Sequence, residues 1–225
     1  NIEMKNSLKL NNVFFRFNEN KKDTLNDINL ELKIGKTYGI VGHSGSGKTT
    51  LIDIISGIHS PTKGNVSVDD KLIKNKDSKI IRNFVGYVSQ DPYIFDSSIT
   101  ENIAFENNLN IDKKNTLINS LKMSQLNNWI KNNEISDINL GENGNKISGG
   151  QKQRLNISRL FYNDPNLIIL DEGTSALDGL TENNIKNILN KLKEKKCIVI
   201  VAHRISTIQK CDHIFCKYSI MIVVS

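Results

Sequence analysis

The chain has 225 residues, of which 38% are hydrophobic and 24% charged, and its formal net charge is +6. This length allows one large domain or two small lobes, and no apolar run approaches the roughly 20 residues of a bilayer-spanning helix, so any membrane part is expected on another domain or chain. Aromatic residues make up 6% and the lysines are spread along the chain, which argues against a nucleic-acid platform and favours a solvated basic surface.

Apolar residues at alternating or consecutive positions predict a series of strands in the N-terminal part of the chain. These strands are Val13–Phe17, Ile28–Leu32, Thr37–Val41, Val66–Val68 and Phe84–Ser89. A glycine-rich stretch follows the third strand and leads into a short apolar helix at Thr50–Ile55, and Pro61–Gly64 is expected to form a turn.

From about Ser98 to Asn133 the apolar periodicity becomes helical, which indicates an inserted helical lobe. A second glycine-rich stretch, Gly141–Gly150, closes this lobe. The elements expected after it are the helices Gln151–Phe161 and Thr181–Lys193 and the strands Leu167–Leu170 and Cys197–Ala202. Because strands alternate with helices, the sequence predicts an α/β fold with a mainly parallel sheet.

Residues Gly42–Thr49 fit the pattern G-x-x-x-x-G-K-T between a predicted strand and a predicted helix, which is the context that this phosphate-binding motif requires. Glycines let the backbone curl so that its N–H groups face a phosphate chain, and the helix N-terminus adds about half a positive charge. Lys48 is expected to reach the β- and γ-phosphates, and Thr49 is expected to bind Mg²⁺.

Two acids, Asp171 and Glu172, end the apolar strand Leu167–Leu170. Ligands of open parallel sheets bind at the carboxyl ends of the strands. We expect Asp171 to help hold Mg²⁺, mostly through water, and Glu172 to polarise an attacking water as general base. Asp171 alone would also fit a helix N-cap, so the pair is informative mainly because a phosphate loop accompanies it.

A second candidate anion site is the helix start at Ser148–Gln151, where two glycines follow a serine hydroxyl. Ser148 alone would also fit a plain N-cap. A chain with two such helix starts and one acid pair either binds two phosphates or offers the second start to a nucleotide on another copy.

The segment Ser148–Gln151 resembles the signature motif of ATP-binding cassette (ABC) proteins, and the other motifs of that family follow in the expected order along nearly the whole chain. By this resemblance, Phe17 is similar to the aromatic residue that stacks on adenine, and Gln90 to the glutamine that senses Mg²⁺ and the attacking water. Ser175–Asp178 is similar to the loop that crosses the dimer interface, and His203 to the switch histidine that contacts the γ-phosphate.

The resemblance implies an ATPase whose ligands are ATP and Mg²⁺. Its implied catalytic residues are Glu172, His203 and Gln90, and its implied Mg²⁺ ligands are Thr49, Gln90 and Asp171. The implied nucleotide contacts are Phe17, Gly42, His43, Ser44, Gly45, Ser46, Gly47, Lys48, Thr49, Thr50, Ser148, Gly149, Gly150, Gln151 and Asp178.

The implied fold is a P-loop NTPase core with a mainly parallel sheet, an N-terminal antiparallel β portion and an inserted helical subdomain. Residues 1–225 are expected to form one nucleotide-binding domain, with the core at about 1–90 and 160–225 and the helical subdomain at about 98–160. The implied partners are the transmembrane domain of an exporter, on the same or a separate chain, and a second nucleotide-binding domain in a head-to-tail dimer that sandwiches ATP. The implied location is the cytoplasmic face of a membrane, and no nucleic acid is expected.

Two segments narrow the resemblance to exporters. Phe95–Ile103 is similar to the exporter segment after the glutamine, and Gly141–Gly144 to the loop that touches the transmembrane domain, where Glu142 matches its acid. The departures from the family pattern are Phe17 for the more frequent Tyr, Ile147 for Leu, Gly173 for Ala or Pro, and the tail Cys216–Ser225, which lacks the usual turn with Gly and final hairpin strand.

Three alternatives compete with this interpretation. A GTPase is suggested by Asn20–Asp23, which matches N-K-x-D, but the chain contains no Asp-x-x-Gly for the expected metal switch. A soluble ABC protein acting on ribosomes or nucleic acid would suit the positive charge, whereas the lack of heptads between Gln90 and Ser148 and the presence of Glu142 argue against it. A nucleotide-binding module without turnover has no support, because the residues for turnover are all present.

Overall fold

The computed structural model describes residues 3–17, 22–132, 134–135, 138–171, 173, 177–202 and 208–216. The chain divides into two compact units. The strand unit comprises Asn1–Tyr87, Pro165–Ile169 and Leu192–Ser225, and the helical unit comprises Val88–Asp164 and Leu170–Lys191.

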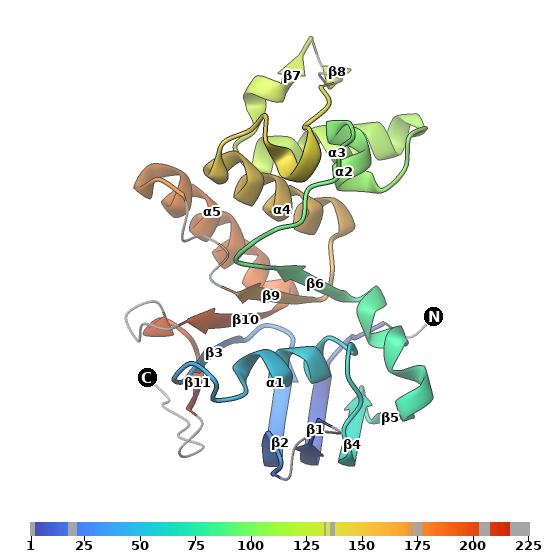
Figure 1. The fold of residues 1–225 in the computed structure, drawn as a ribbon, viewed down its shortest axis with the longest axis vertical. Coiled ribbons are helices and arrows are strands. Elements are labelled where there is room, and N and C mark those ends of the chain that lie inside the picture. The colour runs from blue at the N-terminus through green and yellow to red at the C-terminus, as the bar shows by residue number, and fades with distance from the viewer. Residues whose placement is uncertain are drawn as a thin grey trace. The chain divides into compact units, whose positions relative to one another are not determined.

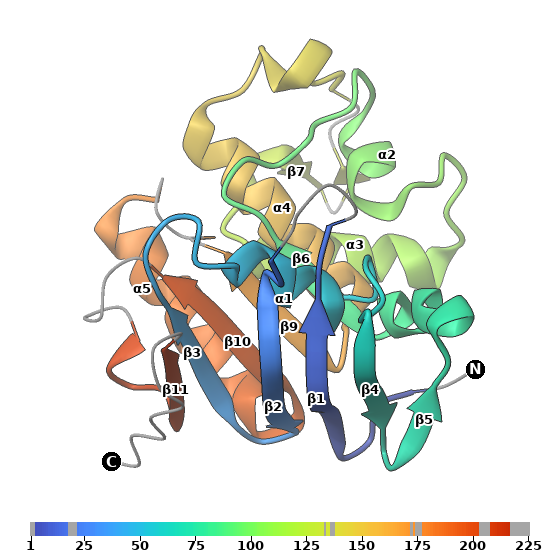
Figure 2. The same cartoon turned by 60° about the horizontal axis from the view of Figure 1, so that its bottom comes forward.

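An antiparallel sheet in the strand unit has the order β2-β1-β4-β5 (Figure 2). Its strands are β1 (Ser7–Phe15), β2 (Leu25–Lys33), β4 (Lys63–Val68) and β5 (Lys71–Ile73). The register places Leu8 of β1 opposite Leu32 of β2 and Val68 of β4, and all three side chains are buried. Since side chains alternate between the two faces of a strand, this register gives the sheet one apolar face.

A second sheet has the strand order β11-β3-β10-β9-β6. Its strands are β3 (Thr37–Val41), β6 (Val85–Val88), β9 (Leu167–Asp171), β10 (Cys197–Ala202) and β11 (His213–Cys216). Strand β3 pairs in parallel with both β10 and β11. The two sheets together confirm the predicted α/β fold with a parallel sheet and an N-terminal antiparallel portion.

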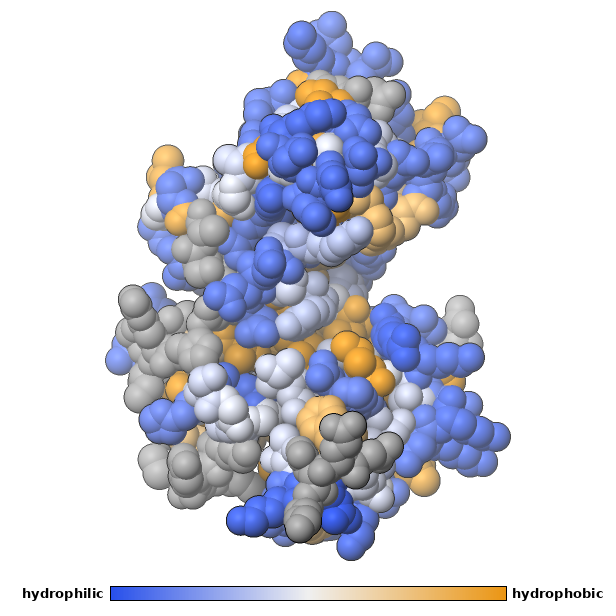
Figure 3. Space-filling view, viewed as in Figure 1, coloured by the Kyte–Doolittle hydropathy of each residue, from blue (hydrophilic) through white to orange (hydrophobic). Residues whose placement is uncertain are grey.

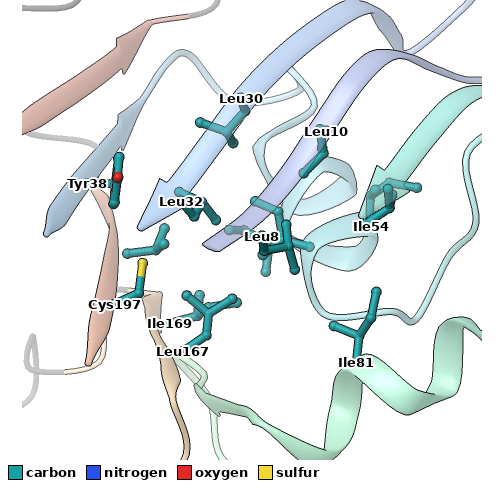
Figure 4. Close-up of a cluster of buried hydrophobic side chains, with 14 of the residues drawn as sticks. Leu8, Leu10, Leu30, Leu32, Tyr38, Ile54, Ile81, Leu167, Ile169 and Cys197 are labelled. Carbon is teal, nitrogen blue, oxygen red and sulfur yellow. The ribbon is translucent and has the colours of Figure 1, made fainter. Parts of the chain in front are cut away.

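A large hydrophobic core lies in the strand unit (Figure 4). Ile52, Ile54 and Ile55 of helix α1 (Lys48–Ile55) are at most 2% exposed and pack with residues of both sheets. Ile81 joins them from a stretch of 3₁₀-helix, η1 (Asn75–Asn83), and the short turn η4 (Lys193–Lys195) precedes β10. This packing fixes the direction of α1 and therefore the loop that connects β3 to it.

Helices make up most of the helical unit (Figure 1). They are α2 (Ile99–Ala104), α3 (Ile111–Met123), α4 (Gly149–Asn163) and α5 (Gly179–Leu192), with the short elements η2 (Asn127–Trp129), β7 (Ile130–Lys131), β8 (Glu134–Ile135) and η3 (Glu142–Gly144). Four-residue spacing puts Ile99 and Ile103 of α2, and Leu117 and Leu121 of α3, on inward faces that are fully buried around Trp129. The visible outer surface over this unit is mostly hydrophilic (Figure 3).

The main difference from the sequence prediction concerns β1. It spans Ser7–Phe15, so the predicted strand Val13–Phe17 began too late and ended too late. Asn12 has a φ of 48° where the pairing register shifts, and this irregularity breaks the apolar alternation that the prediction used. Strands β5, β7, β8 and β11 and the stretch η1 were not predicted, so Cys197–Ala202 is not the last strand of its sheet, because β11 follows it in the chain. Within the described ranges no helix is long and apolar enough to cross a bilayer.

Candidate functional site

The phosphate loop connects the buried strand β3 to helix α1, as the motif predicts. Gly45 and Gly47 have φ values of 74° and 89°, a backbone conformation that favours glycine. A Cβ atom at Gly42 would lie 2.6 Å from Ser46 Oγ, so a larger residue there would displace the Ser46 hydroxyl. Gly47 caps α1 without any side-chain hydrogen bond, and the first turn of α1 has no acidic residue. The first N–H groups of α1 are therefore suited to an anion.

The side chains of Lys48, Ser46, Thr49 and Thr50 differ in their contacts with this loop. The Lys48 Nζ atom donates hydrogen bonds to the carbonyl oxygens of Gly42 at 2.7 Å and His43 at 3.0 Å, so the ammonium lies over the loop. Ser46 Oγ is buried and has no hydrogen-bond partner in the described part of the chain. Thr49 is exposed, whereas Thr50 is buried in the core side of α1. A cation, an orphaned hydroxyl and a helix N-terminus together fit a phosphate group.

Phe17 lies just beyond the end of β1 and is 41% exposed. Its ring meets Phe15 edge-on with centroids 4.9 Å apart, and it meets His59 edge-on at 5.8 Å. An exposed aromatic ring that is held from behind can offer its free face to a planar base.

The predicted second anion site lies in the helical unit, at the start of α4. The Ser148 hydroxyl accepts a hydrogen bond from the Gln151 N–H at 3.2 Å, and the Gln151 side chain accepts one from the Ser148 N–H at 2.9 Å. This capping box means that Ser148 is the N-cap of α4. A Cβ atom at Gly149 would have no neighbour within 4 Å, so the helix start is open to solvent beside its cap.

Asp171 is the last residue of β9, whose residues Leu167–Leu170 are buried. Glu172 and His203 lie outside the described residues, as do Ser175, Ala176, the Asn20–Lys21 part of the N-K-x-D pattern and residues 217–225 of the tail. Asp178 is described, and its carboxylate accepts a hydrogen bond from the Thr181 N–H at 3.0 Å near the start of α5. This backbone hydrogen bond lowers the pKa of Asp178.

Gln90 follows β6 and is exposed. The segment after it is held by two polar residues that the sequence did not point to, the buried Asn102 of α2 and the half-buried Arg159 of α4. Arg159 donates hydrogen bonds to the Asn102 carbonyl at 2.6 Å, the Asn102 side-chain oxygen at 3.1 Å and the Tyr93 carbonyl at 2.8 Å. Burial lowers the pKa of Arg159 to about 10. The sequence signal for Asn102 is an amide on the same helix face as the apolar residues Ile99 and Ile103.

The two segments that resemble exporter contacts with a transmembrane domain lie side by side in the helical unit. The Leu140 N–H donates to the Ser97 carbonyl at 2.9 Å, and Ser98 and Asn139 form an antiparallel bridge. Glu142 is exposed next to this pairing. Large aromatic side chains are also exposed nearby in the sequence: Tyr93 is 65%, Phe95 42% and Phe105 59% exposed.

Residues 25–175 match the ABC transporter family. Proteins of Staphylococcus aureus strains NCTC 8325 and COL, described as multidrug export ATP-binding/permease proteins, are each 40% identical to this chain over 215 residues, which is 95% of this chain and 37% of each relative. A bacterial Atm1-family ABC exporter solved with ATP bound superposes with a TM-score of 0.84 at 28% identity, over 96% of this chain and 37% of that chain. The chain thus spans about 37% of the length of these relatives. On both its sequence and its fold, this chain belongs to the ABC transporter family.

Proposed function

We propose that this chain binds and hydrolyses ATP as the motor part of an exporter at the cytoplasmic face of a membrane. The observation that carries the proposal is the phosphate loop, in which an uncapped helix start, Lys48 and the unpartnered Ser46 hydroxyl converge in the strand unit. Residues 1–225 would form one nucleotide-binding domain, with the core at about 1–90 and 160–225 and the helical subdomain at about 98–160. The relatives are exporters by description and give the ribosome or nucleic-acid alternative no support.

Each residue of the proposed site has a distinct role. On binding, the Lys48 ammonium would exchange the Gly42 and His43 carbonyls for oxygens of the β- and γ-phosphates. The N–H groups of the loop would donate hydrogen bonds to the same phosphate oxygens. Thr49, Asp171 and Gln90 are the proposed Mg²⁺ ligands, directly or through water. The metal ion, when bound, neutralises charge on the phosphates. The resemblance assigns the activation of the attacking water to Glu172 and contact with the γ-phosphate to His203.

The active unit is proposed to be a head-to-tail dimer with shared sites. The chain carries one phosphate loop and one signature helix start, Ser148–Gln151, so two copies would provide a complete pair of sites. Hydrolysis per molecule should therefore rise with protein concentration until dimers saturate. Light scattering across the same dilution series would show whether the chain is a monomer or a dimer. Constant specific activity from a monomer would mean that each copy is catalytically complete.

The proposed partner on the membrane side is the transmembrane part of the exporter. The support is the exposed loop at Glu142, hydrogen-bonded through Leu140 to the segment after Gln90, and the exposed aromatic residues that follow Gln90 in the sequence. Exposed aromatic groups with polar surroundings are typical of protein–protein contacts.

Two variants with a matched control test the ATPase assignment. Lys48→Ala should weaken ATP binding strongly in a direct titration, whereas Lys79→Ala, which removes an exposed lysine of η1, should leave the affinity unchanged. Glu172→Gln should keep ATP binding and lower phosphate release about 10²- to 10⁴-fold, since it preserves the size of the side chain and removes the base. Unchanged affinity in Lys48→Ala, or near-normal turnover in Glu172→Gln, would overturn the corresponding role.

A further inference from the structure

The segment after α1 leads the chain from the helix that begins at the phosphate loop into β4, which pairs with β1. Gly57 makes this turn possible, because its φ is 69° and a Cβ atom there would lie 2.3 Å from the Ser78 carbonyl oxygen. The N–H groups of Ile58 and His59 both donate to the Asp53 carbonyl, at 2.8 and 3.2 Å. His59 is thus attached by its backbone to the last turns of α1.

The same segment is attached to β1 on its other side. The N–H and the hydroxyl of Thr62 both donate to the Phe14 carbonyl, at 2.8 and 3.0 Å. Pro61 between these points is buried. Residues 59–62 therefore form a short brace, which we call the α1–β1 brace, between the helix that begins at the phosphate loop and the strand that leads to Phe17.

His59 contacts both aromatic residues at the end of β1. Its ring stacks on Phe15 with centroids 5.1 Å apart and an interplanar angle of 26°, and it meets Phe17 edge-on at 5.8 Å and 88°. Phe15 meets Phe17 edge-on as well, at 4.9 Å and 90°. Phe15 is 7% exposed, so it is part of the core, whereas Phe17 is 41% exposed. His59 and Phe15 together form a frame against which the exposed Phe17 ring rests.

We propose that His59 is a positioning residue for the base of the bound nucleotide. It holds the Phe17 ring in the orientation in which its free face meets the base, and it does so from the α1–β1 brace. The inference rests on the proposed function, in which Phe17 stacks on adenine. His59 acts through Phe17, so it affects recognition of the base and leaves the phosphate contacts of Lys48 and Thr49 as they are.

The size of the effect follows from aromatic pair energies. Removing the His59 ring takes away one stacked and one edge-to-face contact and frees the Phe17 side chain to rotate, which the bound base must then reverse. We expect ATP affinity to fall about threefold to tenfold. Tripolyphosphate carries the same phosphate chain without a base, so its affinity should not change.

Calorimetric titration of the 225-residue chain with Mg²⁺–ATP and with Mg²⁺–tripolyphosphate tests this inference. The variants are His59→Ala, His59→Phe, which keeps a ring, and Ile58→Ala, which truncates an exposed neighbour in the same segment. His59→Leu fills the volume without a ring and replaces His59→Ala if that variant does not fold. Phe17→Ala serves as the reference for loss of the base contact.

The expected result is a lower ratio of ATP affinity to tripolyphosphate affinity in His59→Ala and Phe17→Ala, with the ratio retained in His59→Phe and Ile58→Ala. Equal loss of both affinities in His59→Ala would mean a purely structural role and overturn the inference. An unchanged ratio in His59→Ala beside a lowered ratio in Phe17→Ala would overturn the inference alone. An unchanged ratio in Phe17→Ala would remove the proposed base contact itself.

Discussion

Asn102 is the polar residue whose loss should damage the helical unit most. Its side chain is fully buried, its oxygen accepts hydrogen bonds from the Phe95 N–H at 2.9 Å and from Arg159 at 3.1 Å, and its amide donates to carbonyls of Phe95 and Ser98 at 3.0 Å. Asn102→Leu would replace this amide with an apolar group of similar size. The variant therefore tests whether the network, and not the filled volume, stabilises the unit.

The magnitude can be worked out from which groups lose their last partner. The Phe95 carbonyl also accepts from the Ser97 N–H at 2.8 Å, and the Ser98 carbonyl from the Asn102 N–H at 3.0 Å, so both carbonyls keep a partner. The Phe95 N–H loses the Asn102 oxygen as its acceptor, and because this hydrogen bond is only partly buried, its loss costs about 1 kcal/mol, at the low end of the range for an unsatisfied N–H. Arg159 loses one of its charged hydrogen bonds as well, so the expected loss is about 2–4 kcal/mol.

Urea unfolding followed by tryptophan fluorescence measures this loss, because the single tryptophan of the chain, Trp129, lies in the core of the helical unit. With a urea dependence of about 2 kcal/mol per M, the midpoint should fall by about 1–2 M. Asn107→Leu, at an exposed position shortly after α2, is the matched control and should shift the midpoint little. A midpoint for Asn102→Leu equal to that of the control would refute the reasoning.

Two further outcomes follow from the structure. Gly149→Ala should leave thermal stability unchanged or slightly higher, because a Cβ atom there has no neighbour within 4 Å. The same variant should lower ATP turnover, because the methyl group would lie where the partner's phosphate is proposed to bind. Thermal melting and phosphate-release assays measure the two effects. Burial alone would raise the pKa of Asp212, but hydrogen bonds from Thr37 and Lys193 outweigh it and hold that pKa well below the ordinary value. A carboxylate with a depressed folded-state pKa stabilises the protein above its unfolded-state pKa of about 3.9, and this contribution is lost as pH falls below that value. The difference in unfolding free energy between the wild type and Asp212→Asn should therefore shrink as pH falls from about 5 towards 2. A difference that does not change with pH would contradict this expectation.

The sequence was most informative where local chemistry and local structure coincide. The loop from Gly42 to Thr49 could be predicted because its glycines, its lysine and the flanking strand and helix are contiguous, and the family match supports the same assignment. The helix start at Ser148 was predictable for the same reason, since a capping box is a pattern of four consecutive residues. The inserted helical region and the parallel sheet followed from changes in apolar period.

Features that depend on contacts between distant residues were not predictable in this way. His59 is far from Phe15 in the sequence, and their stacking depends on how α1 and β1 pack. From the sequence, Arg159 fits an exposed charge on α4, because its acceptors, the carbonyls of Tyr93 and Asn102, are distant in the sequence. The start of β1 was missed because the irregularity at Asn12 breaks the period that marks a strand.

The two proposed anion sites, at the starts of α1 and α4, differ in a way that bears on the order of binding. The first N–H groups of α1 have no side-chain cap and lie beside Lys48, so a phosphate there satisfies donors that otherwise depend on water. At α4 the Ser148 hydroxyl already accepts from the Gln151 N–H, and Lys48 has no counterpart in the capping box. A single copy should therefore bind nucleotide first at α1, with the weaker site at α4 engaging only a phosphate that another copy already holds. In the proposed dimer, this difference would make closure depend on ATP, whose phosphates would lie between the α1 start of one copy and the α4 start of the other.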